Sequence, residues 1–310
     1  MNLHYPVMLP EILQALSPKD GGVYVDGTFG NGGYTSAILE SSNCTVYAID
    51  RDGNAAARAG ELKDKYGDRF VFLRGCFGDV KSLLSSAGVE KLDGFVLDVG
   101  VSSMQIDEAA RGFSFQRDGA LDMRMDASSG ITAADIVNTY EEEKLANLIY
   151  EYGGERKSRH VARKIVEMRI DKPFERTLEL ADAVRSVIYR SHKDKIDPAT
   201  RTFQALRIAV NDELGELERA LDASIDILSL GGVLAVVSFH SLEDGRVKRF
   251  LKEKAGDISK GSRHMPQVDD KAASVFKILS RKAIKPSDQE ISENPRSRSA
   301  RMRVGVRCEG

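Results

Sequence analysis

Three acidic residues follow short apolar runs, and a glycine-rich turn follows the first of them. Asp26, Asp50 and Asp98 each end such a run, and four glycines lie within residues 27–33. A glycine turn between a strand and a helix lets a ligand approach unpaired backbone N–H groups. A carboxylate can also accept two hydroxyl donors at once. These residues could therefore bind a cofactor that carries ribose, although solvent-exposed strand ends or helix caps would show the same pattern.

The spacing around the glycine turn favours one class of cofactor. From Asp26 the chain reads D-x-T-x-G-x-G, one step from the D/E-x-G-x-G-x-G of S-adenosylmethionine (SAM) enzymes. The dinucleotide pattern G-x-G-x-x-G fits less well, because Thr35 stands where its third glycine belongs. Asp50 follows Gly32 at close to the distance, about 20 residues, at which Rossmann-like folds place an acid on ribose hydroxyls.

Apolar runs alternate with helical patterns around these residues. Strands are expected at 23–26, 45–50, 70–73, 94–98 and 233–239, with helices between them. This alternation predicts an α/β fold with a parallel sheet covered on both faces, and ligands then bind at the carboxyl ends of the strands. Residues 274–279 and 300–306 are further expected to form an antiparallel hairpin at the sheet edge. In its second strand the apolar residues 300, 302, 304 and 306 alternate with Arg301, Arg303 and Arg307, so one face should be apolar and the other basic.

The alternation stops after Asp98. Helical patterns follow one another without a strand pattern, and one long helix is expected over 203–229, capped by Gly231 and Gly232. The sequence therefore predicts an α/β domain made of residues 1–108 and 205–310, with an all-helical domain inserted at 109–204.

Composition excludes several classes of protein. The formal net charge of −2 gives no global signature of nucleic-acid binding, so any RNA contact must come from local patches. The three cysteines are far apart, which favours reduced thiols and a cytoplasmic protein. Five scattered histidines lack metal-ligand spacing, so no metal is expected. No apolar run is long enough to span a bilayer, so no membrane partner is expected. Nothing fixes the oligomeric state, and a homodimer is left open.

One helical pattern near residue 160 carries a basic face. Val161, Ile165 and Met168 fall on one side of it, while Arg156, Arg159 and Arg163 fall on the other. Such a face could bind phosphates, and a solvated outer surface would show the same pattern.

Several longer blocks of sequence resemble one family, the bacterial 16S rRNA (cytosine-N4)-methyltransferases, also called small-subunit rRNA methyltransferase H. The blocks run from one end of the chain to the other. They are residues 4–8 (HYPVM), 26–33 (DGTFGNGG), 97–103 (LDVGVSS), 111–115 (RGFSF), 121–126 (LDMRMD), 200–205 (TRTFQA), 238–244 (SFHSLED) and 294–299 (NPRSRS).

The resemblance implies a class I SAM-methyltransferase (Rossmann-like) sheet with an inserted helical domain for substrate RNA. It implies methyl transfer from SAM to the exocyclic N4 amine of a decoding-centre cytidine in 16S rRNA of the small ribosomal subunit. The cofactor positions of the family fall on Gly32, Gly33, Tyr34, Asp50, Phe77, Asp98 and Gln105. Tyr34 stands where the family often has histidine, so its backbone N–H is the group expected to contact the cofactor.

The implied reaction needs a group that accepts a proton from a weakly nucleophilic amine. The lone pair of a cytosine amine is delocalised into the ring, so an acceptor must hold its N–H as the methyl arrives. Asp98, Ser102 or a loop carbonyl could act as this acceptor, and His240 could take the proton. His240 could equally be a helix cap or a packing residue.

The implied substrate also needs residues that bind RNA. A target base must leave its stack, and aromatic side chains can then receive it. Phe113 and Phe115 are candidates, although core packing is the commoner fate of phenylalanine. The candidates for phosphate contacts are Arg111, Arg124, Arg159, Arg163 and Arg201, for each of which a surface salt bridge is the alternative.

Three other functions remain open from the sequence. A methyltransferase that acts on a protein or small molecule would share the cofactor half. A nucleotide-dependent oxidoreductase is opposed by the missing third glycine. A non-catalytic RNA-binding factor could retain the fold, although the intact cofactor residues argue against it.

Overall fold

The computed structural model describes residues 6–189, 196–256 and 274–309. His4 and Tyr5 of the first sequence block lie outside the described residues. The chain falls into two compact units. Unit 1 comprises residues 1–100 and 214–310, and unit 2 comprises residues 101–213. We describe each unit separately.

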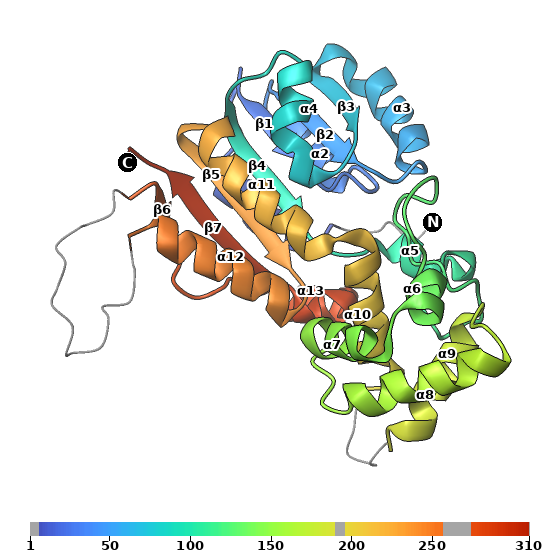
Figure 1. The fold of residues 1–310 in the computed structure, drawn as a ribbon. Coiled ribbons are helices and arrows are strands. Elements are labelled where there is room, and N and C mark those ends of the chain that lie inside the picture. The colour runs from blue at the N-terminus through green and yellow to red at the C-terminus, as the bar shows by residue number, and fades with distance from the viewer. Residues whose placement is uncertain (1–5, 190–195, 257–273, 310) are drawn as a thin grey trace, which may run out of the picture. The chain divides into compact units, whose positions relative to one another are not determined.

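Unit 1 is built on a seven-stranded sheet with the order β3-β2-β1-β4-β5-β7-β6 (Figure 1). The first five of these strands are parallel, and β7 is antiparallel to both β5 and β6. The sheet is therefore that of a class I SAM-methyltransferase, and the expected edge hairpin is present. The strands are β1 (Val23–Asp26), β2 (Thr45–Asp50), β3 (Phe70–Arg74), β4 (Leu92–Asp98), β5 (Leu228–Ser238), β6 (Phe276–Ile278) and β7 (Arg301–Arg307).

Helices cover both faces of this sheet, because successive strand residues point to opposite sides. One apolar cluster joins α1, α2 and α3 to residues such as Val46 and Val96. A second cluster joins α4, α11 and α12 to the alternate residues, such as Ile49 and Leu97. The helices of unit 1 are α1 (Leu9–Leu16), α2 (Gly33–Ser41), α3 (Ala55–Tyr66), α4 (Val80–Ser86), α11 (Glu213–Ile227, from its second residue on), α12 (Ser241–Lys254) and α13 (Asp288–Glu293).

Strand β7, which lies between β5 and β6, differs in one respect from its alternating pattern. Met302 and Val304 are buried as expected, but Arg303 on the opposite face is only 9% exposed. Its guanidinium donates to both carboxylate oxygens of Asp244 on α12, at 2.6 and 3.2 Å. Packing of α12 against β7 thus turns part of the expected basic surface into a buried ion pair.

The described residues of unit 2 form helices and the loops that join them, together with one isolated bridge between Ala120 and Arg176. Its core contains Ile136, Ile149, Ile165 and Leu206, one from each of four helices. The helices are α5 (Ser103–Asp107), α6 (Ala133–Thr139), α7 (Glu142–Gly153), α8 (Ser158–Asp171), α9 (Thr177–Val187) and α10 (Ala199–Asn211).

The single long helix expected over 203–229 is wrong. Asp212 has a left-handed backbone (φ 48°) and separates α10 from α11. The side chain of Asn211 accepts from Met125 N and donates to Met123 O, each at 2.7 Å, so α10 is anchored to a loop of unit 2. Side-chain hydrogen bonding to a distant loop leaves no signal in a helical period.

The limits of the units also differ from the expected 108/109 and 204/205. The first boundary falls after residue 100, because α5 packs beside the short helix at Ala109–Arg111. The second falls after Glu213, which pairs with Arg207 on α10 at 2.8 and 2.9 Å. Gly231 and Gly232 do not cap a helix: α11 ends at Ile227, and both glycines lie inside β5, where its register with β4 shifts.

Candidate cofactor and catalytic site

The glycine turn between β1 and α2 is held in place by Asp26. Its Oδ1 accepts from Thr28 N at 3.2 Å, while its Oδ2 accepts from the backbone N and Oγ1 of Thr35 at 3.2 and 2.7 Å. Burial raises the pKa of Asp26 to about 6, although these hydrogen bonds favour the ionised form. Asp26 is completely buried, so it shapes the turn from within and is not a solvent-exposed strand end.

Two glycines give the turn its conformation. Gly30 (φ 51°) and Gly32 (φ 73°) are both in the left-handed region, which other residues rarely adopt. A Cβ on Gly32 would also lie 2.8 Å from the ring of Phe29 and 2.9 Å from Leu62. The first turn of α2 then begins at Gly33. The N–H groups at this helix start have no partners within the helix, as an anion-binding turn requires.

Asp50, at the end of β2, is brought directly to this turn. Its Oδ2 accepts from Gly30 N and its Oδ1 from Asp52 N, both at 2.8 Å. Burial raises the pKa of Asp50 above its ordinary value, and the two amide donors oppose that rise. Each carboxylate oxygen has two acceptor positions, so Asp50 can still accept from hydroxyl groups of a ligand.

Phe77 lies next to Gly27, the first glycine of the turn. It begins the short helix Phe77–Asp79 after β3, and its Cβ is 3.4 Å from where a Cβ on Gly27 would stand. Glu216 on α11 fixes this segment by accepting from Gly78 N at 2.8 Å. The ring of Phe77 is half-buried, so part of it is available to a ligand.

Asp98, at the end of β4, completes the group at this edge of the sheet. Its backbone N–H donates to Thr28 Oγ1 at 2.7 Å. Its Oδ1 is shielded from solvent and has no hydrogen-bond partner within the described part of the chain. Burial raises the pKa of Asp98 to about 8, and the nearby carboxylates of Asp26, Glu243 and Glu290 add to that rise.

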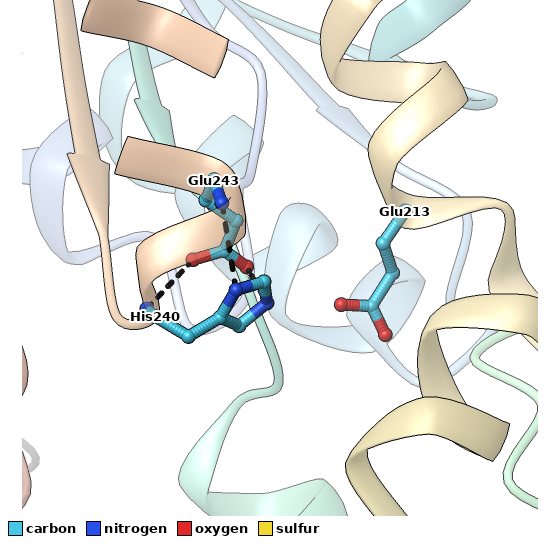
Figure 2. A group of neighbouring side chains, drawn as sticks. All are labelled: Glu213, His240 and Glu243. Carbon is cyan, nitrogen blue, oxygen red and sulfur yellow. Dashed lines mark hydrogen bonds and ion pairs between the residues drawn. The ribbon is translucent and has the colours of Figure 1, made fainter. Parts of the chain in front are cut away.

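His240 begins α12 as a helix cap (Figure 2). Its Nδ1 accepts from Glu243 N at 3.4 Å, while Glu243 Oε2 accepts from Phe239 N and His240 N at 2.8 and 3.2 Å. Its Nε2 lies 2.8 Å from Glu243 Oε1, although the two atoms are not aligned as a hydrogen bond. Glu213, also drawn in Figure 2, ends unit 2 and pairs there with Arg207.

These contacts restrict what His240 can do as a base. While Nδ1 accepts from a backbone amide, the neutral ring carries its proton on Nε2. No ring lone pair is then available to take a proton unless the cap opens. The cap alternative considered from the sequence is therefore present in the structure.

Comparison with known proteins supplies the family. The model of the MraW methylase family matches residues 1–307. The chain belongs to the MraW methylase family. It is 56% identical over 310 residues to the ribosomal RNA small subunit methyltransferase H of Rhodospirillum rubrum, covering 99% of this chain and 94% of that protein. The protein of the same name from Paramagnetospirillum magneticum is 57% identical over 305 residues, covering 98% and 95%. The family resemblance seen in the sequence is confirmed.

Ser102 and Gln105 of this MraW-family chain lie in unit 2, at the start of α5. Ser102 Oγ accepts from Gln105 N at 3.2 Å, and Ser102 N donates to Gln105 Oε1 at 3.1 Å. The pair therefore forms a capping box, in which each side chain satisfies an amide at the helix start. The Ser102 hydroxyl can still donate its proton, but one of its acceptor positions is used by the cap.

Two of the arginines expected to contact RNA hold the structure of unit 2. Arg111 Nη2 donates to the carbonyl oxygens of Arg124 and Met125 at 3.1 and 2.9 Å. Arg124 makes a bidentate pair with Asp122, at 2.8 and 2.7 Å. Both guanidinium groups thus bind within the loop at 122–126. For Arg124, the structure shows the salt bridge that the sequence left open as the alternative to a phosphate contact.

The other three arginines are more accessible. Arg159 is exposed on α8, and the Arg163 side chain is 65% exposed, with its Nε 3.5 Å from Glu142. The Arg201 side chain is 54% exposed and contacts buried Glu155 at 3.5 Å. Met168, expected on the apolar side of α8, is 36% exposed.

Phe113 and Phe115 both pack against the core of unit 2. The ring of Phe115 lies 4.7 Å from that of Phe203, edge to face, and the Arg185 guanidinium lies 5.5 Å from its centre. Phe115 also lines a cavity of about 610 Å³ together with Gln116, Leu178, Arg185, Ile196, Asp197 and Thr200. Phe115 therefore combines a core contact with an accessible edge.

Sequence reasoning missed several residues that shape the site. Thr28 lies inside the glycine motif, so a polar residue at that position was the available signal. Glu216 and Glu290 come from distant parts of the chain and stand in no motif, so nothing local indicates them.

Among the described residues, no helix combines the length and the apolar character that crossing a bilayer needs.

Proposed function

We propose that this chain methylates ribosomal RNA of the small subunit with SAM as methyl donor, at the N4 amine of a decoding-centre cytidine in 16S rRNA. The observation that carries the proposal is the grouping of the glycine turn, Asp50, Phe77 and Asp98 at one edge of a class I methyltransferase sheet, in a member of the MraW family. The curated relatives are named as small subunit rRNA methyltransferases, which supports the choice of substrate.

The residues at the carboxyl ends of the parallel strands fit SAM. When bound, SAM supplies an electrophilic methyl group on a sulfonium centre. Gly32, Gly33 and Tyr34 would offer backbone N–H groups to its carboxylate, and Asp50 would accept from its ribose hydroxyls. Phe77 would pack against the adenine. The shielded Oδ1 of Asp98 lacks a partner within the described chain and has two acceptor positions, so it can accept from a donor group of SAM and from the substrate amine.

Asp98 is the proton acceptor that we propose for the amine. Its partner-free oxygen can accept an N–H directly, whereas His240 uses Nδ1 in a helix cap and Ser102 uses its oxygen in another. The raised pKa of Asp98 makes its ionised form a stronger base than an ordinary carboxylate. A nearby positive charge would keep Asp98 ionised at neutral pH.

The exposed arginines of unit 2 are the proposed RNA contacts. Arg159, Arg163 and Arg201 would bind phosphates, and Phe115, which lines the cavity of unit 2, would receive a base. Arg111 and Arg124 would act indirectly by holding the loop at 122–126. Because its substrate is a ribosomal subunit, we expect the enzyme to act in the cytoplasm.

Mass mapping of 16S rRNA tests the substrate. Small subunits that lack the modification are incubated with the protein and SAM, and the RNA is then digested and its cytidines are mapped. We expect one new N4-methylcytidine at the decoding centre with the wild-type protein and none with Asp98→Ala. Methyl groups recovered in ribosomal protein, or on the cytosine C5, would contradict the proposal. A parallel titration with NADH should show no saturable binding.

A further inference from the structure

The segment that precedes α1 packs directly on the cofactor turn. We call this segment, Pro6–Met8, the N-terminal strap. A Cβ on Gly33 would stand 2.2 Å from Pro6 Cγ and 3.1 Å from Pro6 Cβ. Gly33 is not among the glycines with positive φ, so close packing, and not backbone conformation, requires a glycine there. The strap and the start of α2 are thus in van der Waals contact.

The side chain of Tyr34 ties the strap to α2. Its hydroxyl donates to the carbonyl oxygen of Val7, and the ring is only 4% exposed. Tyr34 is the second residue of α2, and its neighbour Gly33 lies against Pro6. Gly33 and Tyr34, which would present N–H groups to SAM, therefore also hold the strap. Tyr34 does so through its hydroxyl, and Gly33 does so because it has no side chain to keep Pro6 away.

Glu290 on α13 holds the strap from a distant part of the chain. Its Oε1 accepts from Met8 N at 2.8 Å. Met8 has a left-handed backbone (φ 54°) that other parts of the structure must stabilise, and its side chain is completely buried. Met8 O in turn accepts from Ile12 N at 3.0 Å in α1. The strap is thus fixed by α2, by α13 and by the helix that it begins.

The strap borders the acids at the strand ends. Burial raises the pKa of Tyr34 well above its ordinary value, and the charges of Asp98, Asp26, Glu290 and Glu11 add to the rise. The charge of Glu290 likewise contributes to the raised pKa of Asp98. Tyr34 directly follows the glycine turn, and Thr28 of that turn accepts from Asp98 N at 2.7 Å, so the anchor of the strap on α2 lies at the same end of the strands as Asp98.

We infer that Tyr34 and Glu290 are positioning residues that hold the N-terminal strap as a wall of the SAM site and slow the release of SAM. The inference rests on the proposed cofactor site. It assigns the Tyr34 side chain a role that its backbone contact with SAM does not need. Loosening the strap should speed dissociation of SAM and raise the KM for SAM by a larger factor than it lowers kcat.

Tyr34→Phe tests this role, because it removes the hydroxyl and keeps the buried ring. We expect faster amide hydrogen exchange in residues 6–16 of the ligand-free protein. We also expect SAM to dissociate about five to ten times faster in stopped flow. The KM for SAM should rise with it, by a larger factor than any fall in kcat. Tyr66→Phe is the matched control. It also removes a tyrosine hydroxyl that binds α2, because the Tyr66 hydroxyl donates to Glu40 of that helix at 2.7 Å, and SAM dissociation should not change.

Glu290 provides a second, independent variant. Glu290→Ala should speed both the exchange of the Met8 amide and the dissociation of SAM. Glu290→Gln should restore both, because a carboxamide oxygen can accept the same bond. An increase in amide exchange without any change in SAM dissociation, in both Tyr34→Phe and Glu290→Ala, would show that the strap only supports the fold and would overturn the inference.

Failure of the cofactor site itself gives a different result. Asp50→Ala is measured alongside, by equilibrium binding of SAM. If Asp50→Ala binds SAM as tightly as the wild type, the proposed site is wrong, and the inference about the strap falls with it. If Asp50→Ala weakens binding but Tyr34→Phe and Glu290→Ala release SAM at the wild-type rate, the site stands and only the strap inference is overturned.

Discussion

The backbone N–H of Asp98 donates to the side-chain hydroxyl oxygen of Thr28, 2.7 Å away. Thr28 lies in the glycine turn after β1, whereas Asp98 ends the neighbouring strand β4. The N–H of Thr28 in turn donates to Asp26 at 3.2 Å. One threonine thus sets the position of the proposed proton acceptor relative to the turn that would bind SAM.

Replacing Thr28 should therefore impair both catalysis and stability. Thr28→Val keeps the shape but removes the acceptor, so the Asp98 amide loses its partner at a cost of about 1–3 kcal/mol in unfolding free energy. We expect kcat to fall on the order of tenfold because the carboxyl group shifts. Thr28→Ser keeps the hydroxyl and should retain most of the activity. Steady-state kinetics with saturating RNA would measure both, and equal kcat values for the two variants would contradict this role.

The raised pKa of Asp98 predicts how stability depends on pH. The folded protein holds the Asp98 proton up to about pH 8, whereas the unfolded chain loses it near the ordinary value of 3.8. Between these values the folded state binds more protons, so the free energy of unfolding falls as pH rises. Asp98→Asn removes this penalty. We expect the ligand-free variant to be more stable than the wild type by roughly 1–3 kcal/mol at pH 8.

Urea unfolding at pH 5 and at pH 8 would measure this effect. The gain from Asp98→Asn should be larger at pH 8, and the variant should lack methyl transfer. Asp93→Asn is a useful control, since Asp93 lies on the same strand and pairs with exposed Lys19. A gain from Asp98→Asn that is the same at both pH values would show that the carboxyl group is not held in its neutral form.

The arginines of unit 2 should separate into two classes. Arg159→Glu combined with Arg163→Glu reverses two exposed charges, and we expect affinity for small-subunit RNA to fall at least about tenfold, with a weaker dependence on salt. SAM binding should be unchanged. Arg249→Glu combined with Lys252→Glu, on exposed positions of α12, makes the same change in net charge and is the control. Equal losses of RNA affinity in both double variants would point to a general charge effect.

Arg124→Ala should act differently, because it removes the bidentate partner of Asp122. Both side chains are partly exposed, so we expect a loss of only about 1 kcal/mol in unfolding free energy. RNA affinity should fall through the loosened loop at 122–126, and thermal unfolding should report the loss. Reduced RNA affinity with unchanged thermal stability would instead assign Arg124 to direct phosphate binding.

The buried pair of Arg303 and Asp244 should be important for the edge of the sheet. Arg303→Met leaves a carboxylate without its main partner where its side chain is only 10% exposed. We expect a loss of about 3–5 kcal/mol in unfolding free energy. Arg303→Met combined with Asp244→Leu should recover part of it, because no unpaired charge remains. Chemical unfolding measures both, and an additive loss in the double variant would refute the coupling.

Local pattern was sufficient to predict most of unit 1. Strand β2 was expected at 45–50 and is found there, since a buried parallel strand is a continuous apolar run that ends on a polar residue. A helix cap at His240 was one of the two alternatives expected there, and α12 begins directly after it. The parallel sheet and the edge hairpin were expected, but the order of strands was not, because β4 pairs with β5 across the whole of unit 2 and β6 pairs with β7 across α13. From this topology alone, Asp26, Asp50 and Asp98 must end at one edge of the sheet.

Only tertiary structure decided what the polar groups of these residues do. In the sequence, Asp26 and Asp50 are equivalent acids at strand ends. In the structure, Asp26 accepts hydrogen bonds from Thr28 and Thr35 inside the turn, while Asp50 accepts one from the turn at Gly30. It treated Arg124 and Arg159 as equivalent cations, although one is paired with a carboxylate and the other is exposed. Residue type and spacing determine which helix, strand or turn carries a side chain. Its partner comes from packing between segments far apart in the chain, as with Met8 and Glu290, and no local pattern records that contact.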